Sequence, residues 1–180
     1  MTTLLPPEQR LRCVCPARPF HIVLVEPEIP PNTGNIARLC AATGCALHLV
    51  GPLGFRIDEH AVRRAGLDYW PLVELHVHSS LRDAEQTTLA LCVSDHHRSS
   101  TSWLFSGRAT RSVFDQRLEL GDTLVFGKES VGLDEGLLAS RVERVLGIPT
   151  AGPVRSLNLA NSVAIVTYEG LRQNDLTRVA

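Results

Sequence analysis

The sequence predicts an α/β fold built around a mostly parallel sheet. Short apolar runs alternate along the chain with segments of helical spacing. The runs are continuous rather than alternating, which is typical of strands buried on both faces. Glycine or proline follows several of them and ends them. With 180 residues, the chain has the length of one domain and can bury a core without disulfides or metal.

The first elements follow from this pattern. Residues 1–19 carry several prolines and no periodicity, so we expect an irregular N-terminal extension before a domain at 20–180. Residues 21–25 form an apolar run and are predicted to be a buried strand. Residues 26–31 contain three prolines, which disfavour helix and ladder pairing and predict a stiff loop. A helix at residues 36–43 should end at Gly44, before a second strand at residues 46–50.

The middle of the chain is expected to continue this alternation. The pattern predicts a short helix at 58–65, a strand at 72–77, a helix at 79–86 and a buried strand at 88–93. Residues 94–111 are rich in polar residues without periodicity, so a long exposed loop is expected there.

The last third predicts a strand at residues 122–126, a helix at 133–140 and a strand at 142–148. A final helix should follow, with Ser156 as its cap, because apolar residues recur at helical spacing after it. Asn158 and Asn161 lie one turn apart on this helix. Since asparagine is a poor helix former, the pair suggests a functional site.

Composition limits the class of protein. The apolar content of 44% and the charged content of 21% are typical of a soluble globular chain, and no apolar run approaches the ~18 residues of a membrane span. The net charge of −1 argues against a protein that coats nucleic acid. Five scattered cysteines indicate reduced thiols and a cytoplasmic location.

No metal site is expected. Cys13 and Cys15 are separated by one residue, which is closer than zinc ligands usually are. His76 and His78 share one face of a predicted strand. We interpret them as surface histidines because no third ligand is near in sequence.

Three segments at predicted strand ends carry residues suited to a site. They are Asn32-Thr-Gly-Asn-Ile-Ala-Arg38, Gly127-Lys-Glu-Ser-Val-Gly132 and the segment at residues 149–158. Ligands of open α/β sheets bind at the carboxyl ends of strands, which favours this region. A Walker P-loop is excluded by spacing and by Glu129, and no G-x-G-x-x-G dinucleotide motif exists.

Together the three segments resemble those of the SPOUT-superfamily RNA methyltransferases that act on ribose 2′-hydroxyls. That pattern is N-x-G-x-x-x-R, G-x-E-x-x-G and S-L-N before a helix that ends Y-E. It is matched here through Tyr168-Glu169. The resemblance covers about residues 20–174. It is closest to the subfamily that methylates the wobble nucleotide of tRNA, through residues 26–35, 63–69 and 155–158. Val131 departs from the pattern, since relatives often have a polar or basic residue there.

The resemblance implies a sheet flanked by helices with a C-terminal trefoil knot, S-adenosylmethionine as cofactor, tRNA as partner and a homodimer that uses the last helix. It implies no membrane and no metal. The implied reaction transfers a methyl group to the 2′-hydroxyl of a cytidine or modified uridine at position 34. Catalytic residues would be Arg38, Asn32, Glu129 and Asn158. Cofactor-binding residues would be Val93, Ser94, Gly127, Gly132, Ile148, Ser156 and Leu157. RNA-binding residues would be Arg63, Arg64, Arg108, Arg111 and Arg155.

Two points stay open from the residues. The chain could methylate another tRNA or rRNA position, or it could be a non-catalytic RNA-binding module of the same fold. At Gly127, a branched side chain is expected to fill ligand space while leaving the fold intact.

Overall fold

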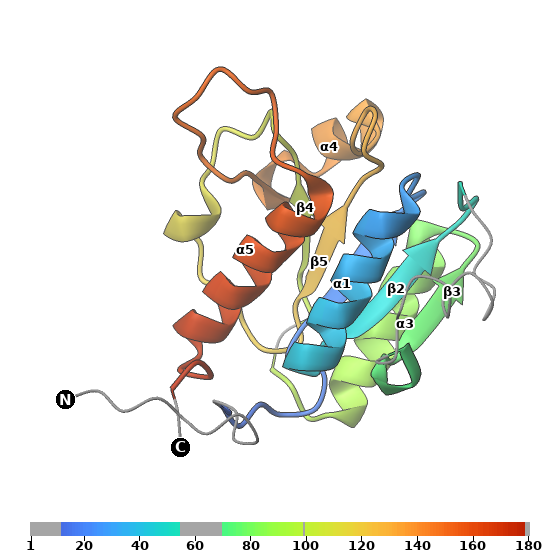
Figure 1. Ribbon diagram of the computed structural model, residues 1–180, viewed down its shortest axis with the longest axis vertical. Coiled ribbons are helices and arrows are strands. Elements are labelled where there is room, and N and C mark those ends of the chain that lie inside the picture. The colour runs from blue at the N-terminus through green and yellow to red at the C-terminus, as the bar shows by residue number, and fades with distance from the viewer. Residues whose placement is uncertain (1–11, 55–69, 99, 179–180) are drawn as a thin grey trace.

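The computed structural model describes residues 12–54, 70–98 and 100–178 (Figure 1). In this part of the chain, six parallel strands form one sheet in the order β3-β2-β1-β5-β4-β6. The strands are β1 (His21–Val25), β2 (Ala46–Val50), β3 (Leu75–His78), β4 (Ser102–Phe105), β5 (Thr123–Phe126) and β6 (Val145–Leu146). The predicted α/β class with a mostly parallel sheet is therefore confirmed.

The strand order places a topological switch between β1 and β5. After β3 the chain crosses to the other side of β1, and β5 then pairs with β1 from His21↔Thr123 to Leu24↔Phe126. The loops that leave β1 and β5 consequently start side by side, although about a hundred residues of sequence separate them. Such a switch point is where open α/β sheets bind ligands.

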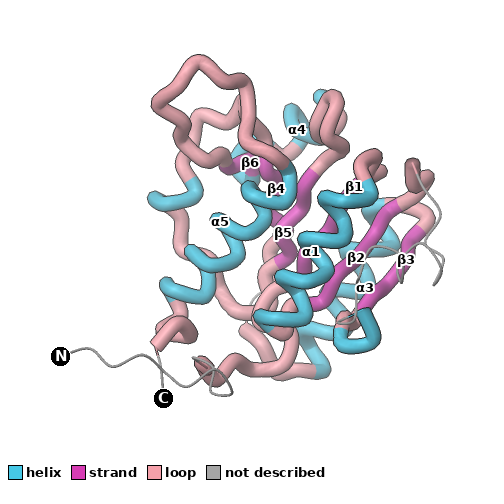
Figure 2. The backbone as a smooth tube through the Cα atoms, viewed as in Figure 1, coloured by secondary structure: helices cyan, strands magenta, loops and turns pink. Residues whose placement is uncertain are grey.

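Helices cover both faces of the sheet. Among the described residues, the α-helices are α1 (Pro30–Thr43), α3 (Leu81–Ser94), α4 (Glu135–Ser140) and α5 (Leu159–Gln173), and the 3-10 turns are η1 (Trp70–Leu72), η2 (Val113–Asp115) and η3 (Val142–Arg144). Helices α1 and α5 lie side by side on one face and α3 lies on the other (Figures 1 and 2). Ile22 and Leu24 of β1 face α1 and α5, while Val23 packs with Ala84 of α3. Within the described ranges, no helix combines the length and apolar character needed to cross a membrane.

Helix α1 starts earlier than the sequence pattern predicts. Pro30 and Pro31, which were expected to lie in a stiff loop, occupy its first positions. A proline is compatible with a first helical turn because the amide it lacks has no helical acceptor there. The C-terminus agrees with the prediction: Gly44 ends α1 with a left-handed φ of 74°.

The predicted strand at residues 88–93 is wrong, because these residues belong to α3. Ser80 caps the helix by accepting from the Asp83 amide, and Ala84, Thr88 and Cys92 form its buried stripe at intervals of four. The predicted exposed loop at 94–111 is wrong as well, since it contains β4. Trp103 and Leu104 of β4 are buried, and Trp103 Nε1 donates to Asp122 (2.9 Å).

Smaller differences concern element ends. Residues 72–77 were predicted as a strand, but they divide between η1 and the later β3. The predicted strand at 142–148 divides between η3 and a two-residue β6, and the helix predicted from residue 133 begins at Glu135. The helix predicted at 58–65 lies outside the described residues.

Residues 12–19 form neither helix nor strand, and they are anchored to the domain. Arg18 bonds to Asp95 beyond α3 and to Glu74 before β3. The Pro19 carbonyl accepts from the Gly121 amide (2.9 Å). The segment therefore crosses the amino ends of the strands, opposite the ends that carry the motifs.

A cluster of histidines spans β1, β2 and β3. His21 and His48 are fully buried. His21 Nδ1 lies 3.1 Å from His48 Nε2, and His48 Nδ1 lies 3.0 Å from His78 Nε2. His76 stacks on His48 with ring centroids 4.7 Å apart. The interpretation of His76 and His78 as surface histidines is incomplete, because both are half-buried members of this cluster on the edge strand β3. Among the described residues, no group of histidines, cysteines and carboxylates is arranged to hold a metal ion.

Burial makes this cluster hard to protonate. It lowers the pKa of His21 from 6.5 to about 4 and that of His48 to about 2, and it also lowers the pKa of His78. Between the folded and unfolded pKa values, the unfolded chain binds more protons than the folded chain. The free energy of unfolding must therefore fall as the pH drops below about 6.5.

We predict that this cluster makes the fold acid-sensitive. His48 alone should reduce the free energy of unfolding by about 2 kcal/mol between neutral pH and about pH 5. Denaturant unfolding at a series of pH values measures the slope. His48→Gln should flatten it, while His96→Gln, at an exposed residue, controls for the loss of a histidine as such. An equal slope in the wild type and His48→Gln would contradict the prediction.

Candidate active site

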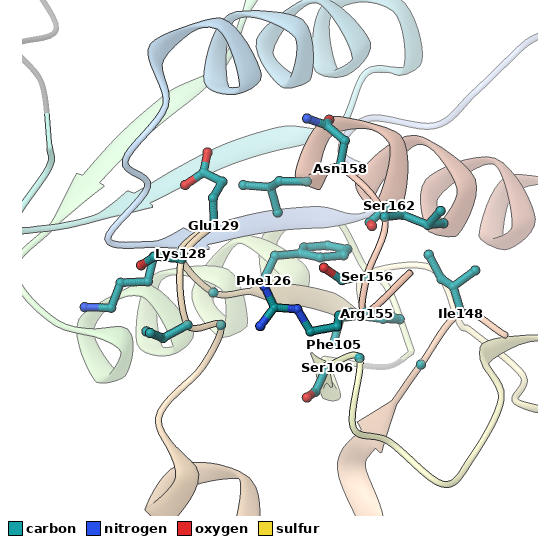
Figure 3. A pocket seen from close by; sticks show the side chains of 18 of the residues that line it. Phe105, Ser106, Phe126, Lys128, Glu129, Ile148, Arg155, Ser156, Asn158 and Ser162 are labelled. Atoms are coloured by element: carbon teal, nitrogen blue, oxygen red, sulfur yellow. The ribbon is translucent and has the colours of Figure 1, made fainter. Parts of the chain in front are cut away.

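A pocket of about 770 Å³ lies at the carboxyl ends of β4, β5 and β6, beside the amino end of α5 (Figure 3). Four segments contribute most of its wall: residues 105–108 at the end of β4, 126–132 at the end of β5, 147, 148 and 150 after β6, and 155–159 leading into α5. Ile29 and Asn32 add the amino end of α1. The pocket is therefore built where the switch point predicts, from loops that are remote in sequence.

A chain of hydrogen bonds joins the three sequence motifs in this pocket. Asn32 Nδ2 donates to Glu129 Oε1 (2.8 Å), and Asn32 Oδ1 accepts from Asn158 Nδ2 (3.0 Å). Asn158 Oδ1 in turn accepts from the Ala160 amide (2.9 Å) and caps α5. Asn158 rather than Ser156 is thus the N-cap, which corrects the expectation. Asn32 is only 6% exposed, so both ends of its amide are satisfied inside the protein.

Glu129 holds the loop before α1 as well. Its oxygens accept from the amides of Glu28 (2.8 Å) and Ile29 (3.3 Å) in addition to Asn32. Ser130 bonds back to Glu28 through its amide (3.0 Å) and its hydroxyl (2.9 Å). The Glu129 carboxylate thus accepts hydrogen bonds from three N–H donors, and charge-assisted bonds of this kind are strong. Glu129 is therefore suited to holding its neighbours in position.

Gly127 is required by the backbone of its own loop. A Cβ atom at this residue would lie 2.2 Å from the carbonyl carbon of Gly132 and 2.3 Å from the Leu133 amide nitrogen. Gly132 has a φ of +79°, which favours glycine. The expectation that a side chain at Gly127 would fill ligand space and spare the fold is therefore wrong, because it would first collide with the turn.

The loops after β4 and β6 also approach closely. A Cβ at Gly107 would lie 3.0 Å from the Arg155 carbonyl oxygen, and one at Gly147 would lie 3.0 Å from the Ser106 carbonyl oxygen. The Ser106 amide donates to Leu146 (3.0 Å), and the Gly147 amide donates to Arg111 (2.9 Å). The segment from β6 to α5 is thereby packed against the loop after β4.

The pocket combines an apolar floor with a charged rim. Phe105 and Phe126 stack there with centroids 4.7 Å apart. Lys128 and Arg155 (Figure 3) and Arg108, which pairs with Glu135 (2.7 Å), are cationic residues of the lining and form this charged rim. An apolar surface with a few polar groups at its edge suits a small molecule that has both a flat ring and charged ends.

Most of the predicted site residues line this pocket. From the catalytic set these are Asn32, Glu129 and Asn158, from the cofactor set Gly127, Gly132, Ile148, Ser156 and Leu157, and from the RNA set Arg108 and Arg155.

The remaining predicted residues lie elsewhere. Val93 and Ser94 end α3 and do not line the pocket, because the strand expected to carry them is a helix. Arg111 lies outside the lining, and its guanidinium bonds to the Glu143 carbonyl and to Gln116. Arg38 is on the exposed face of α1, outside the lining of its own chain's pocket. Arg63 and Arg64 lie outside the described residues.

Sequence reasoning missed the residues at the carboxyl end of β4. Phe105, Ser106 and Gly107 line the pocket at the place that Val93 and Ser94 were expected to fill. The signal was present, since residues 102–105 read Ser-Trp-Leu-Phe and a glycine follows two residues later. An apolar run closed by a glycine is the same signature that identified the strands at residues 46–50 and 122–126.

The fold and the pocket define an α/β protein with a ligand-sized pocket among the loops at its switch point. The chain belongs to the SpoU methylase family, because the SpoU rRNA Methylase family model matches residues 19–168.

Individual relatives agree with this assignment. The chain is 45% identical over 156 residues to the tRNA (cytidine(34)-2′-O)-methyltransferase of Polaromonas sp. (strain JS666), which covers 86% of this chain and 91% of the relative. A solved structure described as giving insights into the 2-OH methylation of C/U34 on tRNA is 44% identical. Its TM-score is 0.76, covering 87% of this chain and 96% of that one. The SpoU methyltransferase AviRb from Streptomyces viridochromogenes, in complex with AdoMet, shares the fold at 23% identity. Its TM-score is 0.72, covering 96% and 64% of the two chains.

We predict that Gly127→Ala deforms the loop at residues 127–133. The added Cβ should lower the free energy of unfolding by roughly 1–3 kcal/mol, the usual cost of overpacking, and should speed amide exchange in the loop. Gly152→Ala is the matched control, because its Cβ meets no atom within 4 Å. It should change stability by less than about 0.5 kcal/mol. Equal stability and exchange in the two variants would contradict the steric account.

Proposed function

We propose that this chain transfers a methyl group from S-adenosylmethionine to the ribose 2′-hydroxyl of the pyrimidine at position 34, the wobble position, of tRNA. The observation that carries the proposal is the hydrogen-bonded chain Glu129–Asn32–Asn158, which brings three motifs into one pocket. The named activity of the 45% identical relative supports this substrate. So does the subject of the 44% identical structure.

The residues of the pocket fit S-adenosylmethionine. The stacked pair Phe105 and Phe126 gives an apolar floor, and Gly127 and Gly132 add backbone without a side chain to the lining. Ile148, Ser156 and Leu157 would hold the cofactor from the segment after β6. The AdoMet complex of AviRb indicates that this fold can hold the molecule. When bound, the cofactor supplies an electrophilic methyl group on a cationic sulfur.

The polar chain orients the reactants in this proposal. The leaving sulfur becomes neutral on transfer, so the protein has to position the ribose and stabilise the oxygen that loses its proton. Asn32 and Asn158 fix the wall of the pocket, and Glu129 fixes Asn32. Glu129 is then a positioning residue rather than the base, because N–H donors occupy its oxygens.

Arg38 stabilises the reacting oxygen or a nearby phosphate. A guanidinium remains protonated near neutral pH, so charge stabilisation asks less of the protein than proton removal does. Since Arg38 lies outside its own chain's pocket, we propose that it serves the pocket of a second copy. Helix α5, which packs against α1, exposes Ile165 (36% exposed) and Tyr168 (51% exposed), and a homodimer would cover them.

Substrate RNA would approach the charged rim. Arg108 and Arg155 line the pocket and would meet phosphates. Arg63 and Arg64 remain candidates in the segment outside the described residues. Arg111 is less suited to bind RNA, because its guanidinium already bonds to the Glu143 carbonyl in η3 and to Gln116.

Three further features belong to the proposal. The methyltransferase domain begins near residue 20, in agreement with the start of the family match. The segment from β6 to α5 is threaded through the loop after β4 as a trefoil knot, which the close approaches at Gly107 and Gly147 support. The protein works in the cytoplasm, where its tRNA substrate is found.

Methyl transfer can be measured directly. The protein is incubated with tritiated S-adenosylmethionine and bulk tRNA, and the labelled nucleotide is mapped. Label on the 2′-oxygen of residue 34 is the expected result. Label at another tRNA position or on rRNA would show that the proposed substrate is wrong and that the proposed methyl transfer is right. An absence of label, with RNA still bound, would indicate a non-catalytic binding module.

We predict that Arg38 acts in trans. Arg38→Ala should lose at least about 100-fold in methyl transfer and still bind S-adenosylmethionine. When it is co-expressed with a chain carrying Asn32→Ala, mixed dimers should contain one complete site, and about a quarter of the wild-type activity should return.

Two results would contradict this arrangement. Mixed dimers without activity would place Arg38 and the pocket in the same chain. Sedimentation as a 19.7 kDa monomer at micromolar concentration would show that no second copy is present to receive Arg38.

A further inference from the structure

Lys128 is the only lysine of the chain, and it lies at the pocket beside Glu129. Its Nζ donates to Glu26 Oε2 (2.7 Å), across the switch point between the loops that follow β5 and β1. Glu129 and Ser130 bond to residues of the same opposite loop. Three consecutive residues of the loop after β5, 128–130, are therefore hydrogen-bonded to the segment at residues 26–32.

The hydrogen bond from Lys128 differs from those of Glu129 and Ser130 because its acceptor, Glu26, has a strained backbone conformation. Glu26 has a φ of +49°, a left-handed conformation that non-glycine residues rarely adopt. Its amide donates to the Val50 carbonyl (2.8 Å), and its carboxylate holds Lys128. Strain of this kind persists only where several contacts fix the residue.

Charge gives Lys128 a second effect on this loop. The two loops contribute three carboxylates, those of Glu26, Glu28 and Glu129, and each accepts a hydrogen bond from the opposite loop. Among the described residues, Lys128 is the cation that bonds to one of them, Glu26. The bond to Glu26 raises the pKa of Lys128, and Glu28 contributes to the increase. Without the ammonium group, neighbouring carboxylates would repel one another and push the loops apart.

We propose that Lys128 is a positioning residue for methyl transfer, which fixes Glu26 and thereby holds Glu129 and Asn32 in register. The inference rests on the proposed function for its kinetic consequence, but the contact itself can be tested without activity. Lys128 acts through the loop at residues 26–29, whose amides bond to Glu129. Its loss should therefore reduce turnover more than it reduces RNA binding.

Because the chain has one lysine, an amine-reactive ester reports on the contact. Peptide mass mapping separates Lys128 from the N-terminal amine, and the labelling rate follows the unprotonated fraction of each. Glu26→Gln should raise the Lys128 rate about tenfold for each unit by which its pKa falls. Glu135→Gln is the matched control, since Glu135 is a carboxylate at the same pocket that pairs with Arg108. Equal labelling of Lys128 in the wild type and Glu26→Gln would overturn the contact, whether or not the protein methylates RNA.

Kinetics then test the positioning role. Lys128→Met should lower kcat by about tenfold, within the range of a misplaced catalytic group, and leave the KM for tRNA within about twofold. Lys128→Arg should restore most of the turnover, because it retains a cation that can bond to Glu26. A higher KM with unchanged kcat and a smaller salt dependence would overturn the proposal and make Lys128 a phosphate contact. Unchanged kinetics in Lys128→Met would overturn it as well.

Discussion

The pocket depends on the side-chain amide of Asn32, which donates to Glu129 and accepts from Asn158. One buried residue thereby links the loops after β1 and β5 to the first turn of α5. Removing either partner would leave a buried polar group unsatisfied, at a cost of about 1–3 kcal/mol. The shape of the pocket is thus set by a polar contact, although apolar packing stabilises the sheet beneath it.

The sheet makes this contact possible. Pairing of β1 with β5 starts the two loops side by side, and packing of α1 against α5 brings Asn158 to Asn32. Gly127 then allows the turn after β5 to close on its own backbone. The Lys128–Glu26 pair fastens the same two loops at a second point. Strand order, close backbone approach and side-chain hydrogen bonds therefore all fix the positions of the loops after β1 and β5.

The sequence predicts the parts of this arrangement that have a local signature. The strands at β1 and β2, the glycine at the end of α1 and the three motifs were all identified from residue patterns. Residues 88–93 were misassigned because a short apolar run within a helix resembles a strand when its periodicity is not tested over the full helix, and two of its apolar residues, Leu89 and Val93, are in fact exposed. That error moved the predicted wall of the pocket from Ser106 to Ser94. The position of Arg38 outside its own pocket and the histidine cluster depend on tertiary packing, which residue spacing does not contain. The cap at Asn158 is a local contact with the Ala160 amide, and the preference of asparagine for this position could have predicted it.

A double-mutant cycle tests the link between the motifs most directly. Asn158→Asp keeps the oxygen that caps α5 but loses the donor to Asn32, and Asn32→Ala removes the amide that receives it. Calorimetric titration with S-adenosylmethionine gives the loss of binding free energy for each variant and for the pair. If both residues act through their contact, the double variant should lose about as much binding free energy as one single variant. The coupling energy between the two residues should then be roughly 0.5–3 kcal/mol. Losses that add within about 0.5 kcal/mol would show that the two residues act independently, and the central role of the contact would be wrong.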